Sequence, residues 1–133
     1  MLKNEIRNYT DYIRYKITLE EKIENLWYEL SGVKGVRYDK LPTLPNPSNE
    51  RQLALMDKLD YYQSELHRVD TQIRFIDSIL DRMDKEEYEL IRFVLIDGHT
   101  LIEAGEKYFV TNTAISKRID TILRKVLNST FNH

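Results

Sequence analysis

The stretch Met83–Leu127, MDKEEYELIRFVLIDGHTLIEAGEKYFVTNTAISKRIDTILRKVL, decides how the last third of the chain folds. Its boundaries predict three consecutive helices with two short connections. Asp84 suits a helix N-cap, and Glu87 follows three residues later, so each side chain can bond a backbone N–H of the first turn. Gly98 stands where a left-handed residue is expected after the last helical turn. The first helix of this stretch is therefore expected between Asp84 and Gly98.

Two further capping signatures follow in the same stretch. Thr100 and Glu103 have the spacing of a capping box, which starts a helix over 101–108. Thr111 can cap a third helix over 112–127, which carries isoleucine and valine at helical spacing. A short helix, a tight turn and a longer basic helix are the layout of a helix-turn-helix. The layout predicts a trihelical DNA-binding domain over 84–133.

The spacing inside this motif predicts which residues pack and which face outward. Gly105 lies ten residues before Ile115, where two crossing helices leave room only for a small side chain, and Ala104 adds to the close approach. With Ile115, Ile119 and Ile122 inward, the opposite face of the last helix is polar. The predicted DNA-binding residues are Thr111, Asn112, Thr113, Ser116, Lys117, Arg118, Thr121, Arg124 and Lys125.

Two chemical roles are expected within that set. The side chains expected to meet base edges in a major groove are Asn112, Thr113, Ser116 and Lys117, with Asp120 on the same face. Those better placed for phosphates are Arg118, Arg124, Lys125 and Thr111. From Lys107 to the end there are five Lys or Arg and one acid, Asp120. Asp120 and Phe109, which replaces the glycine usual in the turn, oppose this interpretation, so a purely structural trihelix stays open.

The motif residues are similar to region 4 of sigma-70 factors. The matching residues are Tyr88-Glu89-Leu90-Ile91, Gly98, Glu103-Ala104, Thr113-Ala114-Ile115-Ser116-Lys117-Arg118-Ile119 and Leu123-Arg124-Lys125-Val126-Leu127. With the long helical segment in front, nearly the whole chain resembles the RinA/ArpU-type regulators of late genes in phages of Gram-positive bacteria. The resemblance implies a DNA-binding transcriptional regulator encoded by a prophage or related mobile element.

The first 83 residues are expected to form a helical hairpin or coiled coil. Apolar residues at steps of three and four predict a helix over 1–30, and a longer one over 49–82. The longer helix carries a heptad seam of Leu55, Leu59, Tyr62, Leu66, Val69, Ile73, Ile76, Leu80 and Met83. The seam needs a partner: either the first helix, through Ile17 and Ile23, or a second subunit in a homodimer.

The connector over 31–48 holds all three prolines, which forbid a continuous helix between the two long ones. Lys34, Arg37 and Lys40 make it mildly basic. A contact with the DNA backbone, a docking segment for host RNA polymerase, and a surface loop that packs on the helices are the three alternatives for its role.

Composition limits the classes of function. The chain of 133 residues has a net charge of −2 and no cysteine, which excludes disulfides and thiolate chemistry. No apolar run approaches the roughly 18 residues of a membrane span, so a cytoplasmic protein without membrane contact is expected. The resemblance to phage regulators implies that this is the cytosol of a bacterial host. The sequence contains no phosphate loop, metal-ligand spacing or nucleophile motif, so we expect no enzyme, no cofactor and no metal site.

Three functions from different classes remain from the sequence. The first is a sequence-specific regulator that binds double-stranded DNA. The second is a small terminase-like DNA-packaging subunit, a family that also combines a helix-turn-helix with a helical oligomerisation segment but usually places the DNA-binding part first. The third is a helical adaptor that binds another protein and no DNA. Particle mass separates the first two, and salt-dependent DNA binding separates both from the third.

Overall fold

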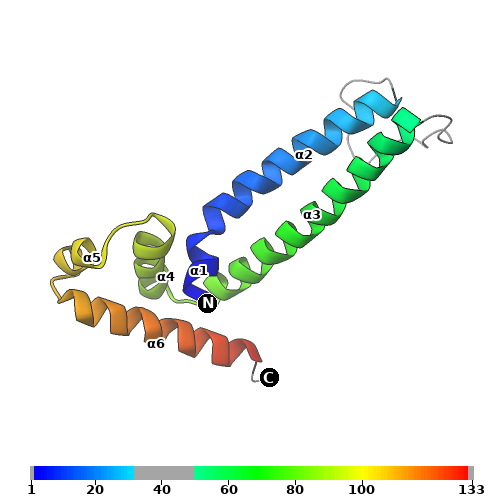
Figure 1. Cartoon of the computed structure of the whole chain (residues 1–133). Helices are drawn as coiled ribbons and strands as arrows, with labels where there is room; N and C mark the ends of the chain where they lie inside the picture. The colour runs from blue at the N-terminus through cyan, green and yellow to red at the C-terminus, as the bar shows by residue number, and fades with distance from the viewer. Residues whose placement is uncertain (1, 32–49, 132–133) are drawn as a thin grey trace. The chain divides into compact units, whose positions relative to one another are not determined.

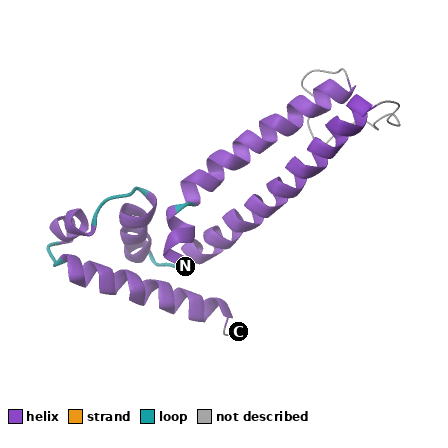
Figure 2. Ribbon diagram, viewed as in Figure 1, coloured by secondary structure: helices purple, strands orange, loops and turns teal. Residues whose placement is uncertain are grey.

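The computed structural model describes residues 2–31 and 50–131, and every regular element in these ranges is a helix (Figures 1 and 2). The all-α prediction is confirmed. The elements are α1 (Leu2–Arg7), α2 (Tyr9–Ser31), α3 (Glu50–Asp81), α4 (Lys85–Ile91), the π-helical turn η2 (Arg92–Ile96), α5 (Leu101–Tyr108) and α6 (Asn112–Phe131). The predicted connector lies, from residue 32 onward, outside the described residues.

The chain forms two compact units, and α2 and α3 each contribute to both. Unit 1 consists of residues 1–11 and 73–133, and unit 2 of residues 12–72. The division expected at Met83 differs from this one, because the first residues of the chain pack with the C-terminal helices. Helix α1 contacts η2, and Ile6 of α1 is fully buried. The predicted DNA-binding domain therefore shares its core with residues far away in sequence.

In unit 2, α2 and α3 lie side by side and run in opposite directions (Figure 1). The core of this unit joins Ile23, Leu26 and Trp27 of α2 to Leu59 of α3. Burying such side chains stabilises a fold by roughly 1.5–3 kcal/mol each before chain entropy is counted. Every residue of the predicted heptad seam is buried or half-buried. The expectation for Ile17 was wrong: this side chain is 52% exposed and lies outside the core.

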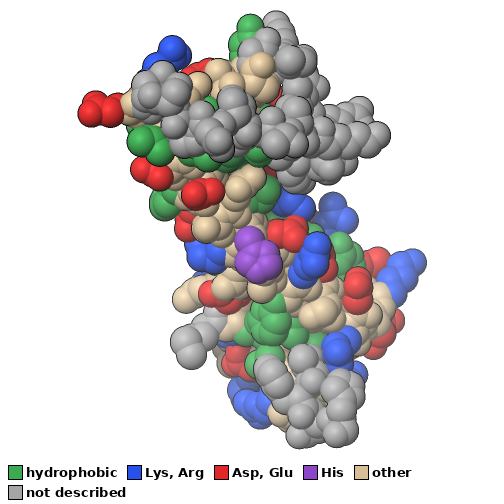
Figure 3. Space-filling model, turned by 90° about the vertical axis from the view of Figure 1, so that its right-hand side faces the viewer, with side chains coloured by type: hydrophobic (Ala, Val, Ile, Leu, Met, Phe, Trp, Pro, Cys, Tyr) green, Lys and Arg blue, Asp and Glu red, His purple; other side chains and the backbone are tan. Residues whose placement is uncertain are grey.

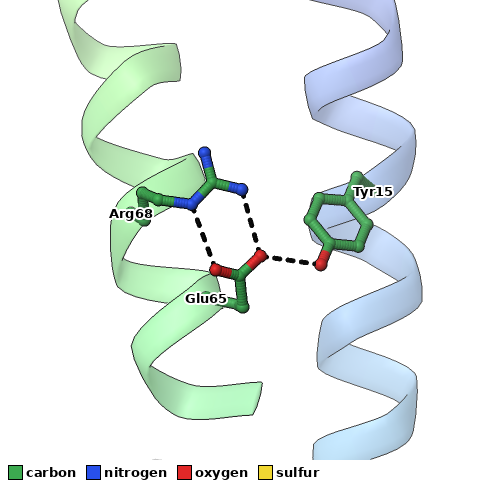
Figure 4. Close-up of polar contacts among 3 residues, drawn as sticks. All are labelled: Tyr15, Glu65 and Arg68. Carbon is green, nitrogen blue, oxygen red and sulfur yellow. Dashed lines mark hydrogen bonds and ion pairs between the residues drawn. The ribbon is translucent and has the colours of Figure 1, made fainter. Parts of the chain in front are cut away.

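Polar contacts join the same two helices (Figure 4). The Tyr15 hydroxyl donates to a Glu65 oxygen at 2.9 Å, and the Arg68 guanidinium donates to both Glu65 oxygens at 3.1 and 3.0 Å. Lys16 donates to Asp70 at 2.8 Å. The hydrogen bonds from Arg68 and then from Tyr15 lower the pKa of Glu65. Arg68 is exposed and the other side chains are half-buried, so solvent still screens these charges and each contact adds little to stability.

The helix expected over 1–30 is broken at Asn8, between α1 and α2. The Asn8 N–H still donates to the Asn4 carbonyl at 3.0 Å, so the chain bends without losing that hydrogen bond. Asparagine favours such positions because its side chain competes for neighbouring backbone groups. The break lets α1 pack as a separate element of unit 1 with Ile6 in its core.

The caps predicted around the first C-terminal helix are confirmed. Asp84 and Glu87 form a reciprocal capping box at the start of α4. After Ile91 the helix widens into η2, in which the Asp97 N–H donates to the Arg92 carbonyl at 2.7 Å, five residues back. Gly98 then ends the segment with a φ of 82°, a left-handed conformation that glycine adopts without steric cost. The predicted helix therefore exists, but its second half is π-helical.

Candidate nucleic-acid interface

Helix α5 is fixed at its start by a second capping box. The Glu103 N–H donates to the Thr100 hydroxyl at 3.1 Å, and the Thr100 N–H donates to the Glu103 carboxylate at 3.1 Å. This backbone hydrogen bond, and then that of the His99 ring, lower the pKa of Glu103. The predicted helix over 101–108 matches α5, and its capping box fixes the residue at which α5 begins.

The turn between α5 and α6 approaches the backbone of α5 closely. The Val110 N–H donates to the Gly105 carbonyl at 3.0 Å, the long hydrogen bond of a Schellman motif. A Cβ atom at Gly105 would lie 2.6 Å from the Val110 carbonyl oxygen and 3.4 Å from the Asn112 nitrogen. The close approach predicted at Gly105 is present, although its nearest neighbours are the turn and the first residue of α6.

Helix α6 begins where the sequence predicts and runs four residues further. The Thr111 hydroxyl accepts from the Ala114 N–H at 3.1 Å, which confirms the predicted cap. The helix continues to Phe131 instead of stopping at residue 127. Its inner face is apolar, as predicted, with the buried residues Ile115, Ile119, Ile122, Leu123 and Val126. Contacts of α6 with α5 and α4 hold this face in unit 1.

The outer face of α6 carries the predicted DNA-binding residues. Eight of the nine are exposed: Thr111, Asn112, Thr113, Lys117, Arg118, Thr121, Arg124 and Lys125; Ser116 is half-buried. Within the described residues, Lys117, Arg118 and Arg124 make no ion pair. The Thr121 hydroxyl donates to the Lys117 carbonyl at 2.9 Å within the helix. The structure thus brings the predicted set together at one cap and along one helix.

One flank of this face is bordered by acids that the sequence analysis did not connect with it. A groove of about 830 Å³ between α4 and α6 is lined by Asp84, Glu86, Glu87 and Glu89 on one wall and by Lys117, Arg118 and Thr121 on the other. Lys125 donates to Glu87 at 3.2 Å. A phosphate that approaches Lys117 or Arg118 from this flank also meets the negative charge of these acids, which weakens its attraction to the two cations.

The acid predicted to oppose DNA binding has a partner in the structure. Asp120 pairs with Lys3 of α1 at 2.6 Å. The ion pair lowers the local negative charge on the outer face of α6. Lys3 was missed by the sequence analysis because it lies more than a hundred residues away and carries no motif. Only the packing of α1 in unit 1 brings it to this site.

The charges elsewhere on the surface are mixed. On the face drawn in Figure 3, Lys and Arg side chains alternate with Asp and Glu, so this face shows no continuous basic surface. The described residues hold no cluster of three or more His, Asp or Glu side chains suited to a metal ion. None of the helices in ranges 2–31 and 50–131 has the length and apolarity needed to cross a bilayer.

No protein-family model, curated protein or solved structure matches this chain.

Proposed function

We propose that this protein is a sequence-specific DNA-binding transcriptional regulator of phage or mobile-element genes. The observation that supports this function is the outer face of α6, where Lys117, Arg118 and Arg124 are exposed, unpaired within the described residues, and carried by a helix with a capped start. A helix with such a face fits the major groove of B-DNA, and the preceding helix α5 would cross the backbone.

The proposed contacts differ along α6. Asn112, Thr113 and Lys117, in the first half of the helix, would meet base edges, where a lysine pairs best with guanine. Arg124, on the same outer face, would bind phosphate, which fixes the position of the helix without selecting a sequence. The Lys3–Asp120 pair would keep Asp120 from repelling the backbone. The host cytosol is the proposed location.

A helical adaptor that binds protein is the second candidate. The acids of α4 that line the groove beside Lys117 and Arg118 favour it, because negative charge there weakens binding to any phosphate backbone. The two candidates differ in their response to salt. A protein that neutralises phosphates releases counterions, so its affinity for DNA falls steeply as salt rises.

The test is the salt dependence of duplex binding by the full chain and two single variants. Arg124→Ala should weaken binding to every duplex and flatten the slope of log K against log salt by about one unit. Lys125→Ala is the matched control, because its ammonium group already pairs with Glu87, and it should change the slope by less. If the wild-type protein does not bind DNA, or binds it with an affinity that does not change with salt, the adaptor is favoured.

A further inference from the structure

Phe109 is the most exposed large hydrophobic residue among those described, at 93%. It is also the only non-glycine residue in the described ranges with a positive φ, 58°. A bulky L-residue adopts this left-handed conformation only at a steric cost, and glycine is the residue that suits the position. Neither the backbone nor the core of the protein gains from a phenylalanine here. This combination indicates that the side chain serves a contact outside the chain.

The surroundings of Phe109 form a small apolar surface next to the proposed DNA-binding residues. An open hollow of about 570 Å³ is lined by Phe109, Ile102 and Val110, and also by Thr111 and Asn112. Ile102 is 61% exposed. The hollow is therefore continuous with the first residues of α6, which would be the first to enter a major groove.

We propose that Phe109 packs against the 5-methyl group of a thymine at the edge of the recognised DNA site. This inference rests on the proposed function and deepens it, because it assigns a base preference to a residue of the turn. Thymine methyl groups are the apolar feature that base pairs present in the major groove, and a phenylalanine side chain can contact them. Ile102 and Val110 would exclude water from the same contact.

The charges near Phe109 favour binding of DNA on the α6 side of the hollow. The first turn of α6 contains no acidic residue, so the positive end of the helix dipole stays available to a phosphate. Glu106 lines the hollow on the α5 side, where it would repel the backbone. DNA would therefore lie over the α6 side of Phe109. Glu106→Gln should raise affinity for all duplexes without changing the preferred base.

The test uses the full chain and a duplex enriched from genomic fragments by the wild-type protein. Single thymines are replaced by deoxyuridine, which removes only the methyl group, and binding is measured for wild type, Phe109→Gly and Phe109→Asn. Glycine and asparagine both tolerate the left-handed conformation, so the turn is kept. Leu53→Ala, which truncates an exposed leucine of unit 2, is the matched control.

The inference predicts that deoxyuridine at one or two edge positions weakens wild-type binding about fourfold for each methyl group. Both Phe109 variants should bind about tenfold more weakly or worse, and the deoxyuridine penalty should disappear in them. Leu53→Ala should behave as wild type. Phe109 variants with unchanged affinity, or a deoxyuridine penalty equal in all proteins, would overturn the inference alone and point to a protein contact. A wild type that enriches no duplex would overturn the proposed function as well.

Discussion

At the turn between α5 and α6, Phe109 holds a φ of 58° while its side chain lies 93% exposed. Phe109→Gly should therefore stabilise the fold. Glycine removes the steric cost of the left-handed conformation, but it also raises the conformational entropy of the unfolded chain. The first effect is larger, so we expect a net gain in stability of about 0.5–1 kcal/mol. Thermal unfolding measures it. Phe109→Ala, which keeps a Cβ at the same φ, should show no gain. A destabilised Phe109→Gly would mean that the side chain packs in solution.

Tyr9 gives a prediction for alkaline pH. Its hydrogen bond to the Asp77 carboxylate, and then burial, raise its pKa from 10.0 to about 12. The folded state therefore holds this proton more tightly than the unfolded state, and the contribution is complete below pH 10.0. Stability should fall as pH rises from about 10 through about 12. Urea unfolding of wild type and Tyr9→Phe at several pH values measures the difference. Equal losses in both proteins over this range would contradict the assigned contact.

At the scale of the elements, the angle between α5 and α6 depends on the absence of a side chain at Gly105. Alanine normally stabilises a helix interior relative to glycine by roughly 0.5–1 kcal/mol. Here its Cβ would lie 2.6 Å from the Val110 carbonyl oxygen, so the turn would have to move. Gly105→Ala should destabilise the protein by about 1–3 kcal/mol.

Chemical denaturation measures the Gly105 effect, and Gly98→Ala is its control. A Cβ at Gly98 meets nothing within 4 Å, so that variant carries only the strain of a φ of 82°. We expect it to cost about 1 kcal/mol and to leave DNA binding intact. Gly105→Ala should also weaken DNA binding, because Thr111 and Asn112 move with the turn. Stabilisation by Gly105→Ala would show that α5 and α6 do not approach this closely.

At the scale of the whole molecule, unit 1 needs the start of the chain. Ile6 is fully buried and belongs to α1, which contacts η2. Ile6→Ala should cost about 2–5 kcal/mol, the range for a buried isoleucine truncated to alanine. Amide hydrogen exchange should show this loss of stability as faster exchange in α4, α5 and α6. Ile17→Ala, at an isoleucine that is 52% exposed, should be almost neutral. Equal effects of the two variants would contradict the place of α1 in unit 1.

The sequence predicted the features that depend on neighbours in the chain. Caps at Asp84, Thr100 and Thr111 act within one helical turn, and the heptad seam of α3 follows from its own period. The features that were missed arise from distant packing. Lys3 reaches Asp120 only because α1 folds into unit 1, and the acids that flank the outer face of α6 belong to a different helix, α4, and its cap.

Two local features were also not predicted by the sequence pattern. The helical spacing of 1–30 continues through Asn8, so periodicity alone does not show the break between α1 and α2. The π-helical turn after Ile91 has hydrogen bonds between residues five apart. The spacing of apolar residues does not distinguish such a turn from an α-helix. In the candidate site, the sequence pattern predicted that the polar residues of α6 would be exposed. The charges of α4 and α1 that lie beside them depend on the fold and could not be predicted from the sequence.

Binding of specific DNA by α6 is tested most directly by selection of bound duplexes from fragmented DNA of the source genome. Wild type is compared with a Lys117→Glu, Arg118→Glu double variant, which reverses two charges on the exposed face of α6 and leaves its buried face unchanged. We expect wild type alone to enrich one or a few sites. Equal enrichment by both proteins, or none by either, would contradict the assignment of α6 as the recognition helix.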